Sequence, residues 1–375
     1  MFVRISNTPR DYAWGSSGRI SEHLGLGGTG TEAELWLGTH PGSPATAADG
    51  RPLGELLDAA GVAHPPFLLK VLAAASPLSL QAHPTTEQAE RGFARENDAG
   101  VDMSAPHRSY KDPFAKPEII VAVSKFEALS GLRDADDALA AVRAVLAVDE
   151  AIRPFARRLE GSLQSAVAWL LSGDAGVAEV VRAVTDAVDA IAEHDAAAAD
   201  TVRRLAQHYP GDPGIAVSLL LNRVTLEPGE ALFLPAGNIH AYLEGLGIEL
   251  MGPSDNVLRA GLTSKHVDAA ELLQIADFSV LHDPRMPREQ LAGATRYAPD
   301  AAFELRWIDG VHRPDASGPA IVLAVAETEV AFADERHTLT AGEAAYFDTL
   351  SGVEFSSADA WLAMAGDTPV GSVNP

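Results

Sequence analysis

The chain has 375 residues, of which 47% are hydrophobic and 21% are charged, with a formal net charge of −24 and no cysteine. This length allows two or three globular domains, and the acidic charge argues against nucleic acid or an anionic membrane as a partner. Without cysteine there is no disulfide, thiol nucleophile or thiolate metal site, so any metal must be held by His, carboxylate or amide oxygen.

The beginning of the chain, MFVRISNTPRDYAWG, lacks the apolar run of a signal peptide. No later segment has the roughly 18 consecutive apolar residues of a membrane span. We therefore expect a soluble, cytoplasmic protein.

The first third of the sequence is typical of strands separated by Gly- and Pro-rich turns. Residues 1–83 have this character, interrupted by one predicted helix at 51–61 (RPLGELLDAAG). A polar helix is predicted for 84–96, because Pro84 and Thr85 suit a helix start. Two more predicted strands follow at 117–123 (PEIIVAV) and 126–132 (FEALSGL).

The middle of the chain changes character at Arg133. Residues 134–209 are rich in alanine, with apolar positions three and four apart, which predicts several packed helices. A further apolar helix is predicted at 214–222 (GIAVSLLLN). Because strands are predicted on both sides, we interpret 134–222 as a helical insertion within one β-domain, composed of residues 1–133 and 223–284.

Residues 285–375 contain a second strand pattern. Residues 339–347 repeat the strand, glycine turn and strand arrangement of 226–234, which suggests a duplicated small barrel. No His or Glu in this copy matches the position of His240, so we expect no metal there. The predicted fold class is thus mainly β with an α insertion and two small barrels.

The stretch from 223 to 265 concentrates reactive side chains between predicted short strands around Gly- and Pro-rich turns. Strands hold functional side chains more rigidly than loops do, so this stretch is the expected centre of the functional site. Its candidate residues are His240, Tyr242, Glu249, Asp255, Arg259 and Lys265.

Three other positions can join His240 in a metal site. Gln81 and His83 are two residues apart in a predicted strand and share a face. Glu118 precedes an apolar strand. Taken singly, each has an ordinary alternative: a polar strand face, a salt bridge for Glu118, or a hydrogen-bonded core residue for His240. Together they form an N and O donor set that suits a divalent ion with an open position.

Seven segments of the sequence, in this order along the chain, resemble the type I mannose-6-phosphate isomerases. They are DYAWG (11–15), AELWLGTHP (33–41), PFLLKVL (66–72), PLSLQAHP (77–84), KPEII (116–120), FEALSGL (126–132) and GNIHAYLEGLGIELMGPSDNVLRAGLTSKHVD (237–268). The resemblance departs at Thr263-Ser264-Lys265 and at the loop 97–113, which shows no matching motif. Both departures concern the rim of the pocket.

The resemblance implies a zinc-dependent enzyme with two cupin-like (jelly-roll) barrels, of which the C-terminal one (285–375) is metal-free. It places one Zn²⁺ on Gln81, His83, Glu118 and His240. The implied substrates are mannose 6-phosphate and fructose 6-phosphate, interconverted through an enediol, a reaction that serves mannose activation or breakdown. We expect a monomer with a small phosphorylated sugar as its partner.

The resemblance also supplies pocket residues without deciding which is the base. They are Lys116, Lys70, Glu249, Asp255, Tyr242 and Arg259. Our hypothesis is that Lys116 handles the proton, because a neighbouring metal cation favours the neutral amine. Ser79, Lys70, Arg259 and Lys265 are candidates for binding the phosphate. The alternatives are a salt bridge from Arg259 to Asp255 or Glu249 and a solvated Lys265.

Three further residues in these segments receive structural roles. Trp14 and Trp36 are expected to pack in the core rather than against sugar, and His40 is expected to be structural. Two other functions stay open: a non-catalytic sugar-binding cupin protein, and a metal-dependent cupin oxidase or decarboxylase. The latter fits less well, because such sites use several histidines and only two are placed here.

Overall fold

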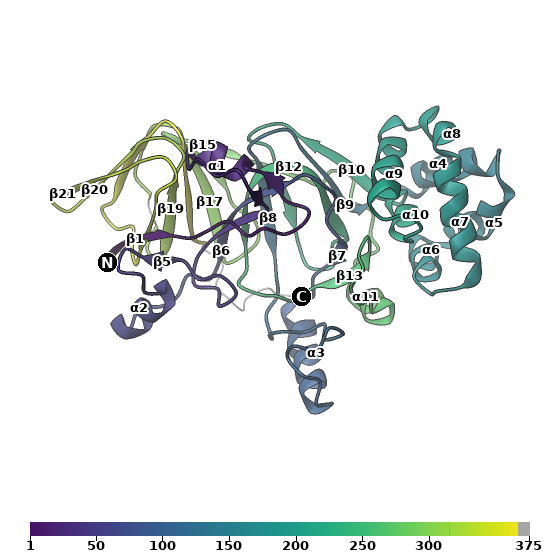
Figure 1. Cartoon of the computed structure of the whole chain (residues 1–375), viewed down its shortest axis with the longest axis horizontal. Coiled ribbons are helices and arrows are strands. Elements are labelled where there is room, and N and C mark those ends of the chain that lie inside the picture. Colours follow the sequence, from purple (N-terminus) through teal and green to yellow (C-terminus); the bar gives the residue numbers. More distant parts are fainter. Residues whose placement is uncertain (315, 367–375) are drawn as a thin grey trace.

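The computed structural model describes residues 1–314 and 316–366. Along the longest axis of the molecule, the C-terminal strands, the central strands and a block of helices follow one another (Figure 1). Among the described helices, none combines the length and the apolar character needed to cross a bilayer. The structure is mainly β, as predicted.

A ten-stranded sheet forms the centre of the molecule. Its main path runs β10-β9-β12-β8-β11-β14, and β12 also pairs with β6 and β7, which in turn pair with β4 and β13. The strands are β4 (Glu34–Leu37), β6 (Leu68–Ala74), β7 (Leu80–Ala82), β8 (Glu118–Ala122), β9 (Phe126–Leu132), β10 (Leu221–Leu226), β11 (Ala231–Leu234), β12 (His240–Met251), β13 (Leu258–Gly261) and β14 (Arg285–Met286).

Strand β12 is longer than the sequence suggested. We expected short strands around glycine turns, but His240 to Met251 is one continuous strand. Gly245 has φ +136°, and a Cβ atom there would lie 2.6 Å from a ring carbon of Phe126. The glycine thus permits a bend and a close approach to β9 rather than ending the strand.

An eight-stranded sheet contains most of the C-terminal strands. Its order is β15-β16-β17-β24-β19-β22-β1-β5. The strands are β1 (Phe2–Ser6), β5 (Thr46–Ala47), β15 (Glu289–Leu291), β16 (Ala294–Tyr297), β17 (Phe303–Ile308), β19 (Ala320–Ala324), β22 (Ala344–Phe347) and β24 (Ala360–Ala365). Two small sheets complete the described β-structure. The first has the order β18 (Val311–His312), β23 (Glu354–Ser357), β20 (Thr328–Phe332) and β21 (Glu335–Leu339). The second consists of β2 (Ser16–Ser17) and β3 (Thr31–Glu32).

Each of the two large sheets includes at least one strand from the other predicted β-domain. Strand β1, which we assigned to the first domain, pairs with β22, so that Phe2 lies opposite Phe347. Conversely, β14 pairs with β11 in the central sheet. The division into 1–133 with 223–284, 134–222 and 285–375 stays a prediction, and residues 367–375 of its last part lie outside the described residues.

The helical segment lies between β9 and β10. It consists of α4 (Ala135–Leu146), the 3-10 helix η1 (Glu150–Ile152), α5 (Arg153–Gly161), α6 (Leu163–Leu170), α7 (Ala175–Asp186), α8 (Val188–Ala192), α9 (Ala196–His208) and α10 (Gly214–Ser218). The last of these ends earlier than expected, because Leu221 and Asn222 already belong to β10.

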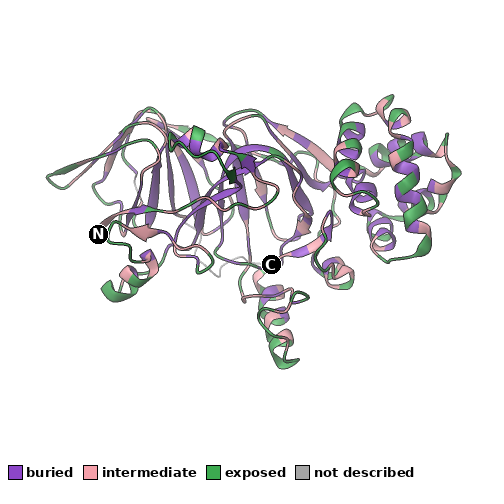
Figure 2. Cartoon of the chain, in the orientation of Figure 1, coloured by how far each residue is buried: buried purple, intermediate pink, exposed green. Residues whose placement is uncertain are grey.

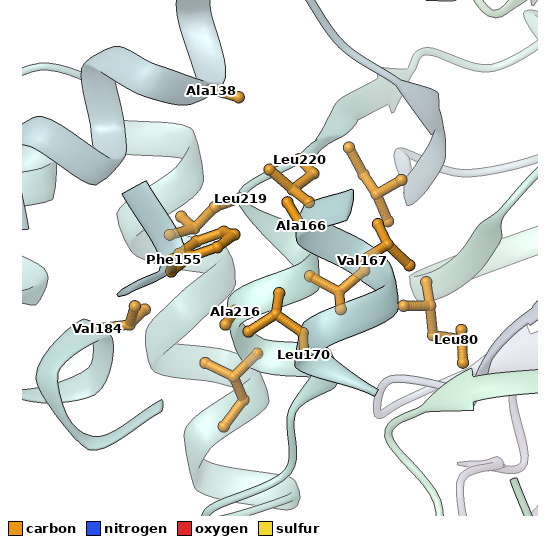
Figure 3. Packing of buried hydrophobic residues seen from close by; sticks show 14 of the residues in the cluster. Leu80, Ala138, Phe155, Ala166, Val167, Leu170, Val184, Ala216, Leu219 and Leu220 are labelled. Atoms are coloured by element: carbon orange, nitrogen blue, oxygen red, sulfur yellow. The ribbon is translucent and has the colours of Figure 1, made fainter. Parts of the chain in front are cut away.

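Apolar side chains connect this helical segment to the central sheet. Phe155, Val167 and Leu170 pack in one buried cluster that also includes Leu80 of β7 (Figure 3). Because Leu80 directly precedes Gln81, this packing helps to hold the strand that carries two of the predicted metal ligands.

Four more of the described helices lie outside this segment. They are α1 (Arg19–Leu24), α2 (Leu53–Ala60), α3 (Thr86–Asp98) and α11 (Ala269–Ile275). The predicted helices at 51–61 and 84–96 correspond to α2 and α3. Thr85 caps α3 in a reciprocal capping box with Gln88, which explains why the helix starts directly after the site strand β7.

The two large sheets share one hydrophobic core. Leu69 and Ile248 of the central sheet belong to the same buried cluster as Phe303, Leu323 and Trp361 of the C-terminal strands. In Figure 2 the strands of both sheets are coloured mostly as buried. The sheet that carries the site is therefore supported on its apolar side by the other sheet.

Candidate active site

The four predicted metal ligands meet at the ends of three strands. Nε2 of His83 lies 3.3 Å and Nε2 of His240 lies 3.4 Å from Oε2 of Glu118. Gln81 lies opposite His240 in the β7 and β12 pairing, with its Nε2 atom 3.5 Å from Nε2 of that imidazole. The candidate ligand atoms of His83, Glu118 and His240 all lie within 4.8 Å of one another.

Backbone carbonyls orient both imidazoles. Nδ1 of His83 lies 2.7 Å from the carbonyl oxygen of Asn256, and Nδ1 of His240 lies 3.0 Å from that of Asn238. A carbonyl can only accept, so each Nδ1 carries the proton and donates it. Each Nε2 then presents its lone pair to the centre, as metal-binding histidines do.

The surroundings favour the protonation states that bind metals. Burial lowers the pKa of His83 to about 4, although the Glu118 carboxylate acts in the opposite direction. Burial opposes the charge of Glu118, but Lys116 and His83 outweigh it and lower the pKa of this carboxyl well below its ordinary value. A neutral imidazole beside an ionised carboxylate is the donor set that a divalent cation requires.

A second observation supports a fit with a metal ion. Nε2 of His83 is fully buried, yet within residues 1–314 and 316–366 it has no hydrogen-bond partner of acceptable geometry. Leaving such an atom without a partner is costly, and a cation would satisfy it. The Gln81 amide presents Nε2 toward His240, and half a turn about its last bond exchanges this group for Oε1, the atom that binds cations.

Lys116 lies beside this centre, as expected. Its Nζ atom is 2.9 Å from Oε1 of Glu118, and the lysine side chain is only 10% exposed. Ser79, at the other edge of the centre, donates to Oε1 of Gln81 at 3.4 Å. Both residues therefore contact a predicted ligand directly.

A second group of predicted site residues forms a buried network of ion pairs and hydrogen bonds. Nζ of Lys70 lies 3.0 Å from Oε2 of Glu249 and 3.5 Å from Oε1 of Glu34. The Tyr242 hydroxyl donates to Oε1 of Glu249 at 3.0 Å. Strand register explains these contacts, because Glu249 of β12 and Trp36 of β4 both lie opposite Lys70 of β6.

Neighbouring carboxylates keep the Lys70 side chain of this network charged. Burial disfavours the ammonium, but the carboxylates of Glu249 and Glu34 outweigh it and raise the pKa of Lys70. Burial raises the pKa of Glu249, against the attraction of Lys70, and it also raises the pKa of the Tyr242 hydroxyl. Tyr242 is therefore a protonated donor at neutral pH.

Arg259 and Lys265 differ from the other cations of the site. Arg259 is half-buried, and the alternative of a salt bridge to Asp255 or Glu249 is wrong, because Asp255 pairs with His40 and Glu249 with Lys70. Burial lowers the pKa of Arg259, and burial together with the Arg259 charge lowers that of the exposed Lys265. In the described part of the chain, neither cation has a carboxylate within ion-pair distance.

Several residues that contact the site were not selected from the sequence. Glu34 accepts from Trp36 Nε1 at 2.9 Å and faces Lys70, while Asn238 and Asn256 supply the orienting carbonyls. His40, expected to be structural, lies 3.2 Å from Asp255. The alternation in ELW places Glu34 and Trp36 on one face of a strand. No sequence signal, however, marks a backbone carbonyl that accepts a hydrogen bond from a histidine.

A cavity of about 680 Å³ adjoins the candidate site. Its walls are largely apolar, with Phe67, Leu68 and Phe114 among them, and its polar lining includes His40, His64 and Asp255. This size is within the range of small-molecule pockets. The loop 97–113, which lacked a recognisable motif, contributes Met103 and Lys111 to it.

The fold is mainly β, and it contains a buried centre of two histidines and a glutamate with several buried charged groups beside it. These features define a metal-dependent enzyme that acts on small molecules. Comparison with known proteins specifies the class further. The model of the catalytic domain of type I phosphomannose isomerases matches residues 2–135. The chain is 36% identical over 320 residues to the mannose-6-phosphate isomerase of Salmonella typhimurium, covering 80% of each chain. It is 32% identical over 340 residues to the human enzyme of that name, covering 79% of this chain and 77% of the relative.

Solved structures agree with this relationship. A mannose 6-phosphate isomerase bound with zinc and yttrium superposes with a TM-score of 0.88 at 30% identity, covering 97% of this chain and 99% of the other. The Salmonella typhimurium enzyme bound to fructose 6-phosphate and zinc gives the same values. The chain belongs to the mannose-6-phosphate isomerase family.

Proposed function

We propose that this protein is a zinc-dependent aldose-ketose isomerase that interconverts mannose 6-phosphate and fructose 6-phosphate. The buried cluster of His83, Glu118 and His240, with Gln81 beside it, is the observation that carries this proposal. Relatives of this name, including one structure bound to fructose 6-phosphate and zinc, support the choice of reaction and metal.

Gln81, His83, Glu118 and His240 would hold the ion. Their amide, imidazole and carboxylate donors suit Zn²⁺, and three of the four are almost fully buried. When bound, zinc supplies a Lewis acid that stabilises negative charge on a sugar oxygen.

The isomerisation moves a proton between C1 and C2 of the open-chain sugar. Lys116 is placed to hold or move a proton at its Nζ atom, because it lies against Glu118 and borders the centre. Asp255 and Glu249 are carboxylates that can accept a proton from carbon or from a sugar hydroxyl. The Tyr242 hydroxyl, fixed by Glu249, can donate to a developing oxyanion.

The phosphate group requires cations that are not neutralised by the protein itself. Arg259 and Lys265 meet this requirement best, since both lack a carboxylate partner in the described residues and their charges repel one another. An anion between them would relieve this repulsion. Ser79 can add a neutral donor, whereas Lys70 is already shared by two buried carboxylates.

The arrangement of the whole chain fits two cupin-like barrels with an inserted helical domain. Supporting this proposal, the central sheet carries the candidate metal centre, and the helices α4 to α10 lie between two of its adjacent strands. That the C-terminal barrel is metal-free, that the protein is a cytoplasmic monomer, and that it binds neither nucleic acid nor membrane remain predictions from sequence.

A coupled assay tests the function. The purified protein, stripped with a chelator and reloaded with Zn²⁺, is given mannose 6-phosphate, and fructose 6-phosphate is followed through phosphoglucose isomerase and glucose-6-phosphate dehydrogenase. We expect turnover that disappears on chelation and returns with zinc. Unphosphorylated mannose is the matched poor substrate. Absence of turnover in the zinc-loaded protein would instead favour a non-catalytic sugar-binding module.

A further inference from the structure

His40 is held in one tautomer by its own loop. The backbone N–H of Gly42 donates to Nδ1 of His40 at 3.1 Å, so Nδ1 is the acceptor nitrogen of the ring. The proton of the neutral imidazole must then be on Nε2, which lies 3.2 Å from Oδ2 of Asp255. The N–H of His40 is therefore the group that faces this carboxylate.

The ring of His40 cannot easily change its position. Trp36 contacts it edge-on, with the ring centroids 4.9 Å apart and the planes at 90°. A Cβ atom on Gly42 would lie 3.2 Å from Nδ1 of the histidine, so the glycine allows the close approach of the loop. The His40 side chain is only 7% exposed. The donor atom is thus fixed relative to strand β4.

Asp255, by contrast, depends on its neighbours for its orientation. Its side chain is 53% exposed and lies in the connection between β12 and β13 rather than in a strand. Its backbone N–H donates to Oδ2 of Asp112 at 2.9 Å, which fixes the main chain. In residues 1–314 and 316–366, His40 is the one side chain in polar contact with its carboxylate.

We propose that His40 is a positioning residue for the isomerisation: it holds the carboxylate of Asp255 by Oδ2, so that Oδ1 is directed at the substrate. This inference rests on the proposed function and on Asp255 as one of its site residues. The arrangement corresponds to other sites in which a group one step removed from the chemistry orients the reacting side chain. The hydrogen bond from His40 also lowers the pKa of Asp255, with the charges of Lys116 and Lys70 acting in the same direction.

The adjoining cavity permits a chemical test of this role. His40 and Asp255 both line it, so truncation of His40 opens a hole that is continuous with a space of about 680 Å³. Added imidazole can reach this hole and restore a donor to Asp255. The derivative 1-methylimidazole has nearly the same shape but no N–H to donate.

The experiment measures kcat, KM and zinc content of His40→Ala, with and without each imidazole. We expect unchanged zinc and a fall in kcat of about 100-fold, the size of effect that a small misplacement of a reacting group produces. Imidazole should restore part of the rate with saturation, and 1-methylimidazole should not. Rates are expressed relative to the wild-type protein in the same imidazole, since imidazole also binds zinc.

The matched control is His208→Ala. His208 lies at the exposed end of α9 and does not line this cavity, so its loss should leave kcat unchanged. Where His40→Ala does not fold, His40→Gln and His40→Met replace it: the first keeps a donor and should retain more of kcat than the second.

Three outcomes overturn the inference: unchanged kcat in His40→Ala, equal rescue by both imidazoles, or equal rates of the Gln and Met variants. An inactive zinc-loaded wild type contradicts the proposed function instead. An active wild type with an equally active His40→Ala contradicts the role of His40 alone.

Discussion

Nζ of Lys116 lies 2.9 Å from Oε1 of Glu118, while the other oxygen of this carboxylate, Oε2, faces both imidazoles. One carboxylate therefore connects the candidate metal centre to a nearly buried ammonium group. This contact gives Lys116 a defined position relative to any substrate bound at the centre. Proton transfer by Lys116 and metal binding by the centre can therefore be tested one at a time.

The first prediction concerns Lys116. In Lys116→Met, Gln81, His83, Glu118 and His240 are all retained, so zinc should remain bound. If Lys116 carries a proton, kcat should fall by about 100-fold or more, the usual contribution of a general acid or base. Zinc is measured by elemental analysis and kcat by the coupled assay.

The control for this prediction is Lys125→Met. Lys125 is an exposed lysine that pairs with Glu127 at 3.2 Å and contacts no site residue, so its loss should not change the rate. An unchanged kcat in Lys116→Met would remove this residue from the mechanism.

The second prediction concerns His240. Its imidazole is 2% exposed and is oriented by the Asn238 carbonyl. His240→Ala should weaken zinc binding by at least about 100-fold and lose activity in parallel. Zinc affinity is measured by competition with a chromogenic chelator.

His208→Ala, at the exposed end of α9, is the matched control and should bind zinc as the wild type does. Activity that survives in His240→Ala would reject the assignment of this residue as a ligand.

The third prediction concerns the phosphate. Arg259→Met and Lys265→Met each remove one charge-assisted hydrogen bond, of about 1.5–3 kcal/mol, which corresponds to roughly a tenfold to hundredfold rise in KM for mannose 6-phosphate. Inhibition by inorganic phosphate should weaken by a similar factor. Turnover of unphosphorylated mannose should change little.

Arg203→Met is the control, because Arg203 pairs with the exposed Asp189 on the helical surface. If KM rises equally for the phosphorylated and unphosphorylated sugars, Arg259 and Lys265 do not bind the phosphate.

The fourth prediction concerns pH and the helical segment. Asp195 caps α9 by accepting from Ala198 N–H at 2.9 Å and pairs with Arg133 at 2.7 Å. Burial opposes its charge, but these two contacts outweigh it and lower the pKa of Asp195. A lowered carboxyl pKa stabilises the fold above the unfolded pKa of about 4, and this contribution is lost as pH falls further.

Asp195→Ala should therefore cost about 1–2 kcal/mol at pH 7, and the difference from the wild type should narrow below about pH 4. Urea midpoints at several pH values measure it. Asp189→Ala, at a side chain that is 96% exposed, should have little effect at any pH. A difference that widens in acid would contradict the direction of the Asp195 shift.

Much of the fold followed from local patterns. Apolar residues three and four apart predicted the helices of the insertion, and the capping residue Thr85 marked the start of α3. The prediction of short strands around glycine turns was wrong for β12, because the sequence does not show that Gly245 lies against Phe126 rather than in a turn. The pairing of β1 with β22 was also missed, since it joins opposite ends of the chain.

The candidate site was likewise predicted correctly only in part. Alternation along a strand correctly put Gln81 and His83 on one face, and both side chains reach the candidate metal centre. The salt bridge considered as the alternative role of Arg259 does not form, because Glu249 and Asp255 are paired with Lys70 and His40. Which side chain reaches which of two carboxylates depends on distances in space, which residue types alone do not contain.

What the sequence by itself determined is the set of chemical groups: two imidazoles, a carboxylate and an amide, each placed in or next to an apolar strand. Their convergence was decided by the tertiary structure. Gln81 and His240 are 159 positions apart, and they meet because strand β12 pairs with β6, β7 and β8 in one register. A shift of one residue would turn these side chains to the opposite face, so the burial of the whole sheet fixes the geometry of the centre.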